Sequence, residues 1–235
     1  MSNFSDLDPL WGDSNIQMRW IEPKQKLGNP DLLIIPGSKQ TIKDLENLNK
    51  SGLSKQIKDY AKSGGNIFGI CGGLQMLGES LEDPLKKESL TELITFSYSG
   101  LELLPIKTTF REIKQNSQRE EAVSWPEKAI VKGFEMHFGE SELIKNKHLN
   151  IISLFTNTSL GWVLEREDKS FIGGTYLHGI FENDTWRKEW INKIRKKKGL
   201  KKLNIIEENK RNERERLLDL LTDFFEKNIN LENLI

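Results

Sequence analysis

The chain has 235 residues, enough for one globular domain with a sizeable core and an appendage. Its 35 Lys and Arg residues balance 35 Asp and Glu residues, and this balance argues against a dedicated nucleic-acid binder, whose domain is usually strongly basic. The longest aliphatic run, Leu32–Ile35, is far shorter than the roughly 18 residues of a membrane-spanning helix. The first residues carry neither a basic start nor an apolar core, so we expect no secretory signal and a cytoplasmic protein without a membrane partner.

The expected architecture is α/β, because from residue 31 short apolar runs alternate with longer amphipathic ones. Buried strands are predicted at Asp31–Ile35 and at Asn66–Ile70, and the second runs directly into Cys71. Between them, apolar positions of residues 41–62 recur at helical spacing with a break near Gly52, which predicts two helices. A tight turn and a further helix are expected after Cys71.

A β-rich region is predicted in the middle of the chain, partly antiparallel. Its short β-prone pieces are Leu101–Leu104, Lys107–Phe110, Ala129–His137, Ile151–Thr156 and Gly161–Glu165. The glycine-flanked segment Gly173–Gly179 closes this region as the end of a strand.

The last part of the chain predicts two helices, Trp186–Lys198 and Glu207–Phe225. Four apolar residues share one face of the second: Leu217, Leu220, Leu221 and Phe224. A basic run at 193–202 lacks interleaved aromatic residues, so a solvated helix end is the better interpretation than a nucleic-acid site. We therefore expect one domain over residues 1–235, with a C-terminal helical extension from about 203 to 235.

The single cysteine, Cys71, lies in Gly69-Ile70-Cys71-Gly72-Gly73 between a strand and a helix. A nucleophile elbow needs this arrangement, because its sharp turn tolerates only small neighbouring residues. A helix N-terminus also favours the thiolate. The alternative is an ordinary buried free cysteine. One cysteine excludes an internal disulfide and a multi-cysteine metal site, and we expect no metal.

A thiolate nucleophile normally needs a histidine as general acid and base, and the chain has three. His178 follows an apolar strand at the sheet edge where α/β proteins gather their active sites, and it is the preferred base. His148 lies in a polar loop context and is discounted. His137 shares a strand face with Glu135, which leaves two interpretations open: a substrate-side role, or a histidine held in place by that carboxylate.

The loop Pro36-Gly37-Ser38-Lys39 follows the first predicted strand. In an elbow enzyme such a loop donates one backbone N–H to an oxyanion hole, and the residue after the nucleophile, here Gly72, donates the other. The loop is not an ATP-binding P-loop, because the glycines that precede the lysine in that pattern are Ser38 and Leu33 here.

Five ordered motifs resemble the triad-type, CobB/CobQ-like glutamine amidotransferase domain of cobyric acid synthase. They are residues 2–10 (SNFSDLDPL), 36–41 (PGSKQT), 69–78 (GICGGLQMLG), 133–139 (GFEMHFG) and 174–179 (GTYLHG). The resemblance implies a flavodoxin-like three-layer class I glutamine amidotransferase fold, with a mostly parallel central sheet and some antiparallel strands. The loop Pro36–Lys39 separates the chain from the sister cobyrinic acid a,c-diamide synthases.

The resemblance also implies a reaction, in which Cys71 attacks the carboxamide of glutamine and His178 relays the proton. The residues implied to bind the oxyanion or glutamine are Gly37, Ser38, Gly72 and Gln75, with Glu135 and His137 as possible substrate-side residues. In the family, the ammonia amidates carboxylates b, d, e and g of adenosylcobyrinic acid a,c-diamide. ATP and Mg²⁺ are expected on a separate amidoligase domain, through which the corrinoid acceptor is also bound, and no cofactor is expected in this chain.

The chain departs from the family pattern in two respects. The amidoligase domain precedes this one in the family, so with Met1 near the junction we expect the first strand of the sheet to be absent. Triad amidotransferases place a glutamate two residues after the histidine, but here that residue is Ile180. Glu182 and Asp184 are the nearest candidates for a third carboxylate.

Two alternatives to this interpretation stay open. One is a stand-alone amidotransferase subunit, like the small subunit of lipid II isoglutaminyl synthase. The other is a non-catalytic binding module, against which the presence of both Cys71 and His178 argues.

Overall fold

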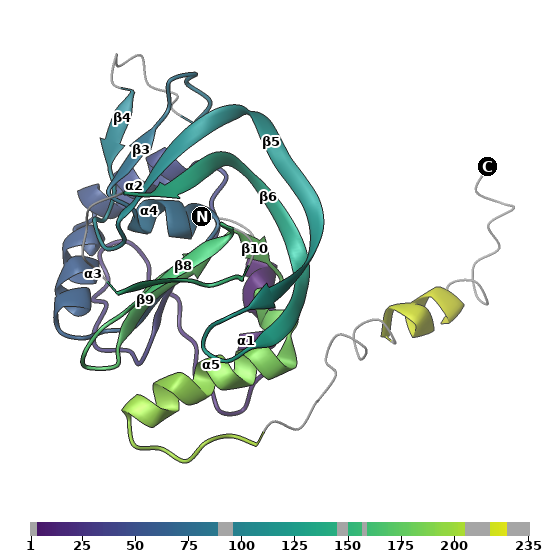
Figure 1. Cartoon of the computed structure of the whole chain (residues 1–235). Coiled ribbons are helices and arrows are strands. Elements are labelled where there is room, and N and C mark those ends of the chain that lie inside the picture. Colours follow the sequence, from purple (N-terminus) through teal and green to yellow (C-terminus); the bar gives the residue numbers. More distant parts are fainter. Residues whose placement is uncertain (1–3, 89–95, 145–149, 157–158, 205–216, 225–235) are drawn as a thin grey trace, which may run out of the picture.

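The computed structural model describes residues 4–88, 96–144, 150–156, 159–204 and 217–224 (Figure 1). It holds two five-stranded sheets with helices packed around them, so the expected α/β class is confirmed. The described residues include no helix that is both long and apolar enough to span a membrane.

The first sheet has the strand order β1-β2-β9-β8-β7. These strands are β1 (Leu33–Ile35), β2 (Ile67–Ile70), β9 (Phe171–Thr175), β8 (Gly161–Glu165) and β7 (Ile151–Ser153). β1, β2 and β9 run parallel, and β8 and β7 continue the sheet antiparallel. Every residue of β2 and β9 is buried, which is why both segments are continuously apolar or glycine-rich instead of alternating.

The two helices predicted before the second strand are present as α2 (Thr41–Lys50) and α3 (Leu53–Lys62). They are separated at Gly52, whose φ of 79° is a conformation that glycine adopts without strain. A short α4 (Gly72–Leu77) follows β2, and α5 (Asp184–Lys197) follows the last strand. The predicted bounds of α5 are therefore right to within two residues.

The second sheet, of order β10-β6-β5-β3-β4, contains the long curved hairpin of β5 (Ile106–Val123) and β6 (Ala129–Leu143) seen in Figure 1. Its other strands are β3 (Ser80–Glu82), β4 (Ser97–Ser99) and β10 (Leu177–His178).

The sequence prediction missed most of this hairpin. Leu101–Leu104 is not a strand, and β5 extends 13 residues past the predicted end at Phe110. The extension is polar and interrupted by a register shift between Phe110 and Gln115, so no apolar periodicity marks it.

The N-terminal segment forms a 3₁₀ turn η1 (Phe4–Leu7) and a short α1 (Asp8–Trp11). Leu7 and Leu10 are buried in the core, which holds this segment beside the 3₁₀ turn η2 (Ile180–Glu182). Among the described residues no strand precedes β1; the expected loss of a first strand stays a prediction.

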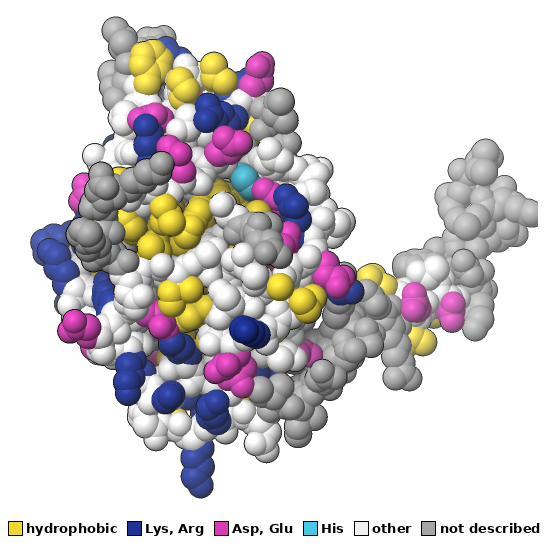
Figure 2. Space-filling model, viewed as in Figure 1, with side chains coloured by type: hydrophobic (Ala, Val, Ile, Leu, Met, Phe, Trp, Pro, Cys, Tyr) yellow, Lys and Arg dark blue, Asp and Glu magenta, His cyan; other side chains and the backbone are white. Residues whose placement is uncertain are grey.

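The C-terminal prediction is only partly within the structure. Residues 217–224 are helical, whereas 207–216 and 225 of the predicted helix lie outside the described residues. The four apolar side chains predicted on one face are all more than half exposed. Acidic and basic side chains are interspersed over the viewed surface of the molecule (Figure 2).

An aromatic cluster fastens α5 to the first sheet. Phe68 of β2 is fully buried and contacts the rings of Phe181, Trp186 and Trp190 at centroid distances of 5.5–6.0 Å. These contacts bury large apolar surfaces, which is the main source of stability in a core of this kind.

We predict that Phe68→Ala lowers the free energy of unfolding by about 3–5 kcal/mol, through lost transfer energy and a cavity. Ile130→Ala, at a site that is 61% exposed, is the control and should change it by less than about 0.5 kcal/mol. Urea denaturation followed by circular dichroism measures both. Similar small losses in the two variants would contradict this assignment of the core.

Candidate active site

Cys71 occupies a sharp turn between β2 and α4. Its φ of 50° and ψ of −109° lie where residues other than glycine are rarely found. The Cys71 N–H donates to the Thr175 carbonyl at 2.7 Å, which continues the pairing of β2 with β9 up to the turn. The thiol lies 3.6 Å from the Met136 carbonyl oxygen of β6, and the residue is only 7% exposed.

The glycines around Cys71 are needed for close backbone contacts. A Cβ on Gly69 would lie 2.5 Å from the carbonyl carbon of Gly73, and a Cβ on Gly73 would lie 2.0 Å from the Ile35 carbonyl oxygen of β1. Neither position accepts a side chain without backbone movement. The predicted order of strand, strained turn and helix is therefore present. The close backbone contacts explain why glycines flank Cys71.

His178, the residue that ends β10, faces Cys71. Burial lowers the pKa of its imidazole, but hydrogen bonds to Asp6 and to Cys71, with their negative charges, outweigh burial and raise that pKa to about 10. The ring is 4% exposed and stacks on Phe134 at a centroid distance of 5.0 Å. At neutral pH the site therefore presents an imidazolium to the sulfur of Cys71.

Asp6 is the residue that sequence reasoning missed. One of its carboxylate oxygens accepts a hydrogen bond from His178 Nδ1 at 2.8 Å, and the other accepts one from the Gly179 N–H at 2.8 Å. It lies 172 positions from His178 in the sequence, so no local spacing could reveal the contact. The only signal was its place inside one of the five family motifs.

The two carboxylates considered from the sequence do not occupy this position. Asp184 pairs with the buried Arg187. Glu182 lies beyond the left-handed Gly179, in η2. The Nδ1 contact of His178 goes to Asp6 instead.

The loop after β1 lies against the residue that follows Cys71. A Cβ built on Gly72 would come within 3.0 Å of the Ser38 backbone nitrogen, so the two main chains pass close together. The Ser38 hydroxyl donates to Asp44 at 2.7 Å and accepts from the Gln40 N–H at 3.0 Å, which fixes the loop. The structure thus brings the backbones of Ser38 and Gly72 close together next to Cys71. An oxyanion hole formed by Gly37, Ser38 and Gly72 stays a prediction.

Gln75 has a different environment from the one expected for a glutamine-binding residue. It is 2% exposed; its amide oxygen accepts from the Thr41 hydroxyl at 3.3 Å, and its amide nitrogen donates to Tyr176 Oη at 3.2 Å. Both ends of the amide thus join α4 to neighbouring elements. A contact between Gln75 and glutamine stays a prediction.

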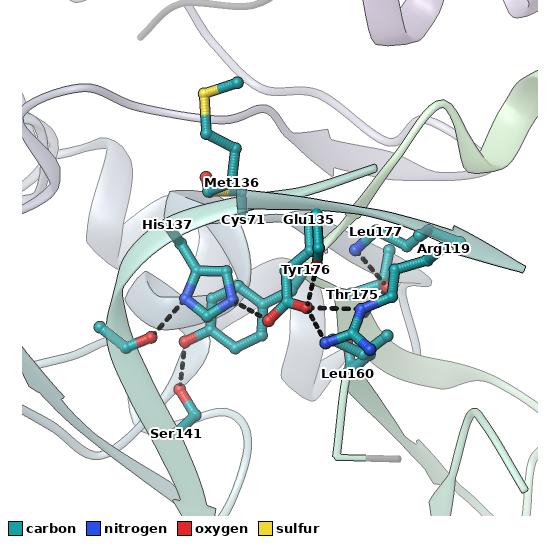
Figure 3. A network of polar contacts seen from close by, with 12 residues as sticks. Cys71, Arg119, Glu135, Met136, His137, Ser141, Leu160, Thr175, Tyr176 and Leu177 are labelled. Carbon is teal, nitrogen blue, oxygen red and sulfur yellow. Dashed lines mark hydrogen bonds and ion pairs between the residues drawn. The ribbon is translucent and has the colours of Figure 1, made fainter. Parts of the chain in front are cut away.

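Glu135 and His137 belong to a buried polar network on β5 and β6 (Figure 3). Glu135 bonds to His137 Nε2 at 2.7 Å and to Arg119 Nε at 2.8 Å, while His137 Nδ1 lies 2.6 Å from the Gly139 carbonyl oxygen. The His137 ring also stacks on the Tyr176 ring, with their centroids 3.8 Å apart. Both ring nitrogens are therefore engaged by the protein, which favours the interpretation of a histidine held in place by Glu135 over a substrate-side role.

The electrostatics of the network agree with this interpretation. Burial lowers the pKa of His137, and its bonds to Glu135 and Gly139 only partly oppose that effect. Burial raises the pKa of Glu135, but Arg119 and His137 outweigh it and the net pKa is lowered. A cavity of about 410 Å³ adjoins the network, and its lining includes His137 but neither Cys71 nor His178. His148, discounted from the sequence, lies outside the described residues.

A buried cysteine on a strained strand-to-helix turn, facing a histidine at the carboxyl ends of the parallel strands, is the arrangement of a nucleophile-elbow enzyme site. Residues 1–186 match the CobB/CobQ-like glutamine amidotransferase domain, and the chain belongs to that family. The fold agrees: a solved glutamine amidotransferase superposes with a TM-score of 0.55 at 14% identity, over 84% of this chain and 92% of that one.

The chain is also similar to proteins named cobyric acid synthase. It is 73% identical to that of Prochlorococcus marinus strain NATL2A, 50% identical to that of strain MIT 9313 and 44% identical to that of Synechococcus sp. strain CC9605. Each match covers the whole of this chain but only 46–47% of the relative. The chain thus spans about half the length of these relatives.

We predict that His178→Ala lowers the rate of glutamine hydrolysis by about 10²–10⁴-fold, because a general acid and base is lost. His137→Ala should cost far less, since both of its ring nitrogens are bound within the protein. Steady-state glutamate release by the two purified variants makes the comparison. Equal losses would show that the base has been wrongly assigned.

Proposed function

We propose that this chain is the glutamine-hydrolysing part of a cobyric acid synthase, which supplies ammonia for ATP-dependent amidation. The observation that carries the proposal is the Cys71–His178 pair on its elbow. Family membership and the names of the relatives support it, and the chain's share of their length agrees with one functional half of a larger enzyme.

In the proposed reaction the Cys71 thiolate attacks the carboxamide carbon of glutamine. The negative charge that develops on the carbonyl oxygen is stabilised by backbone N–H groups of Gly72 and of the loop at Gly37 and Ser38. The C–N bond breaks as the His178 imidazolium gives its proton to the leaving nitrogen, so ammonia and a glutamyl thioester are formed.

The second half-reaction restores the site. Neutral His178 takes a proton from water, whose oxygen attacks the thioester carbon. The C–S bond breaks, glutamate leaves, and the thiolate and imidazolium are present again. The protein's part is to hold these two groups in contact and to exclude bulk water, which their burial achieves.

We also propose acceptors for the ammonia that is released. The acceptors are carboxylates b, d, e and g of adenosylcobyrinic acid a,c-diamide, activated by ATP and Mg²⁺ on an amidoligase partner. The protein would act in the cytoplasm, where this partner and the corrinoid would be found.

We predict that Cys71→Ala abolishes glutamate release from glutamine, because the chain has no other thiol to replace it. The measurement compares the 235-residue chain with this variant, each with and without a separately expressed ATP-binding domain of the same family. Cys71-dependent activity that rises with the partner supports the proposal. Turnover that survives in Cys71→Ala would refute the nucleophile, and a folded but inactive wild-type protein with partner present would favour a binding module.

A further inference from the structure

The two ring nitrogens of the His178 imidazole serve two different neighbours, Asp6 and Cys71. Nδ1 lies 2.8 Å from a carboxylate oxygen of Asp6, so Nε2 is the nitrogen left to hydrogen-bond the side chain of Cys71. A carboxylate only accepts hydrogen bonds, and it therefore keeps a proton on Nδ1. This defines the ring's orientation and, when the imidazole is neutral, the tautomer whose Nε2 can take a proton.

The same carboxylate also fixes the backbone that carries the histidine. Its second oxygen accepts from the Gly179 N–H at 2.8 Å, and Gly179 is in the left-handed conformation with a φ of 74°. This turn leads the chain into η2 and leaves Ile180 only 1% exposed. Ile180, two residues after the histidine, is thus part of the core. The carboxylate that contacts the imidazole comes from Asp6 of η1 instead.

The carboxylate is held firmly. Asp6 is 5% exposed, and the residues after it anchor η1 in the core, with Leu7 at 4% and Leu10 at 2% exposure. Hydrogen bonds between charged groups are stronger at a buried site than in water. Phe134 stacks on a face of the imidazole, and this contact leaves the ring little freedom to turn.

We propose that Asp6 is the positioning carboxylate of the Cys71–His178 pair, the third member that the residues following the histidine do not supply. It acts through His178, whose Nδ1 it contacts. The proposal deepens the glutamine hydrolysis proposed above and rests on it, so its test includes a readout that needs no substrate.

The kinetic test is Asp6→Asn. The Asn oxygen can still accept from the Gly179 N–H, but its NH₂ group then faces Nδ1 and favours the wrong imidazole tautomer. We expect kcat for glutamine hydrolysis to fall by about 10²–10⁴-fold with little change in KM. Asp8→Asn, at an exposed carboxylate two residues away, is the matched control and should leave kcat unchanged. Asp6→Glu should recover part of the rate.

The second readout is the titration of His178, followed by NMR of histidine-labelled protein. The ionisable groups that influence it are Asp6 on η1, Cys71 at the elbow and, across the site, His137 on β6. Removing the Asp6 charge removes a contribution that raises the pKa of His178 from its ordinary value. The pKa should therefore be lower in Asp6→Asn, and the alkaline limb of the activity profile should move to lower pH.

The two readouts separate the proposals. If the wild-type chain hydrolyses no glutamine but Asp6→Asn lowers the pKa of His178, the proposed function fails and the positioning role stands. Wild-type kcat in Asp6→Asn, or a His178 titration that the variant does not move, would overturn the positioning role. Should Asp6→Asn not fold, the wild-type protein alone decides: a hydrogen-bonded Nδ1 proton on His178 supports the role, and its absence at neutral pH overturns it.

Discussion

The strained backbone at Cys71 is the constraint on which the rest of the site depends. A residue with a side chain must sit at a φ of 50° while β2 ends and α4 begins within one turn. This is possible only because Gly69 and Gly73 let α4 press against the backbones of β1 and β2. The same close packing brings the loop after β1 against Gly72. The proposed nucleophile and the proposed oxyanion donors are therefore placed by one set of backbone contacts.

Three ionisable side chains meet at this turn from distant parts of the chain. Cys71 comes from the end of β2, His178 from β10, and Asp6 from the N-terminal turn that Leu7 and Leu10 hold in the core. Because all three are nearly inaccessible to water, their mutual interactions are weakly screened and decide the protonation of His178. The arrangement links the packing of η1 to the chemistry at the sulfur, although η1 itself contributes no reacting atom.

Much of the fold and of the site could be predicted from local patterns. β2, α2, α3 and α5 were predictable because fully buried strands are short and apolar and because amphipathic helices have a clear period. The long hairpin of β5 and β6 was not, since the residues of β5 beyond Phe110 are mostly polar and no apolar alternation marks them. Glu135 and His137 were paired correctly from their spacing on one strand.

The sequence by itself singled out the proposed nucleophile and its proposed base. Only one cysteine exists, its flanking glycines specify the turn, and His178 ends an apolar strand. Only the tertiary structure decided what surrounds them: Gln75 joins neighbouring elements through its amide, His137 is held by Glu135 and Gly139, and the carboxylate on His178 is Asp6. The reason is physical. Backbone conformation follows from neighbours in the chain, whereas hydrogen bonds between side chains depend on which distant segments the core packs together.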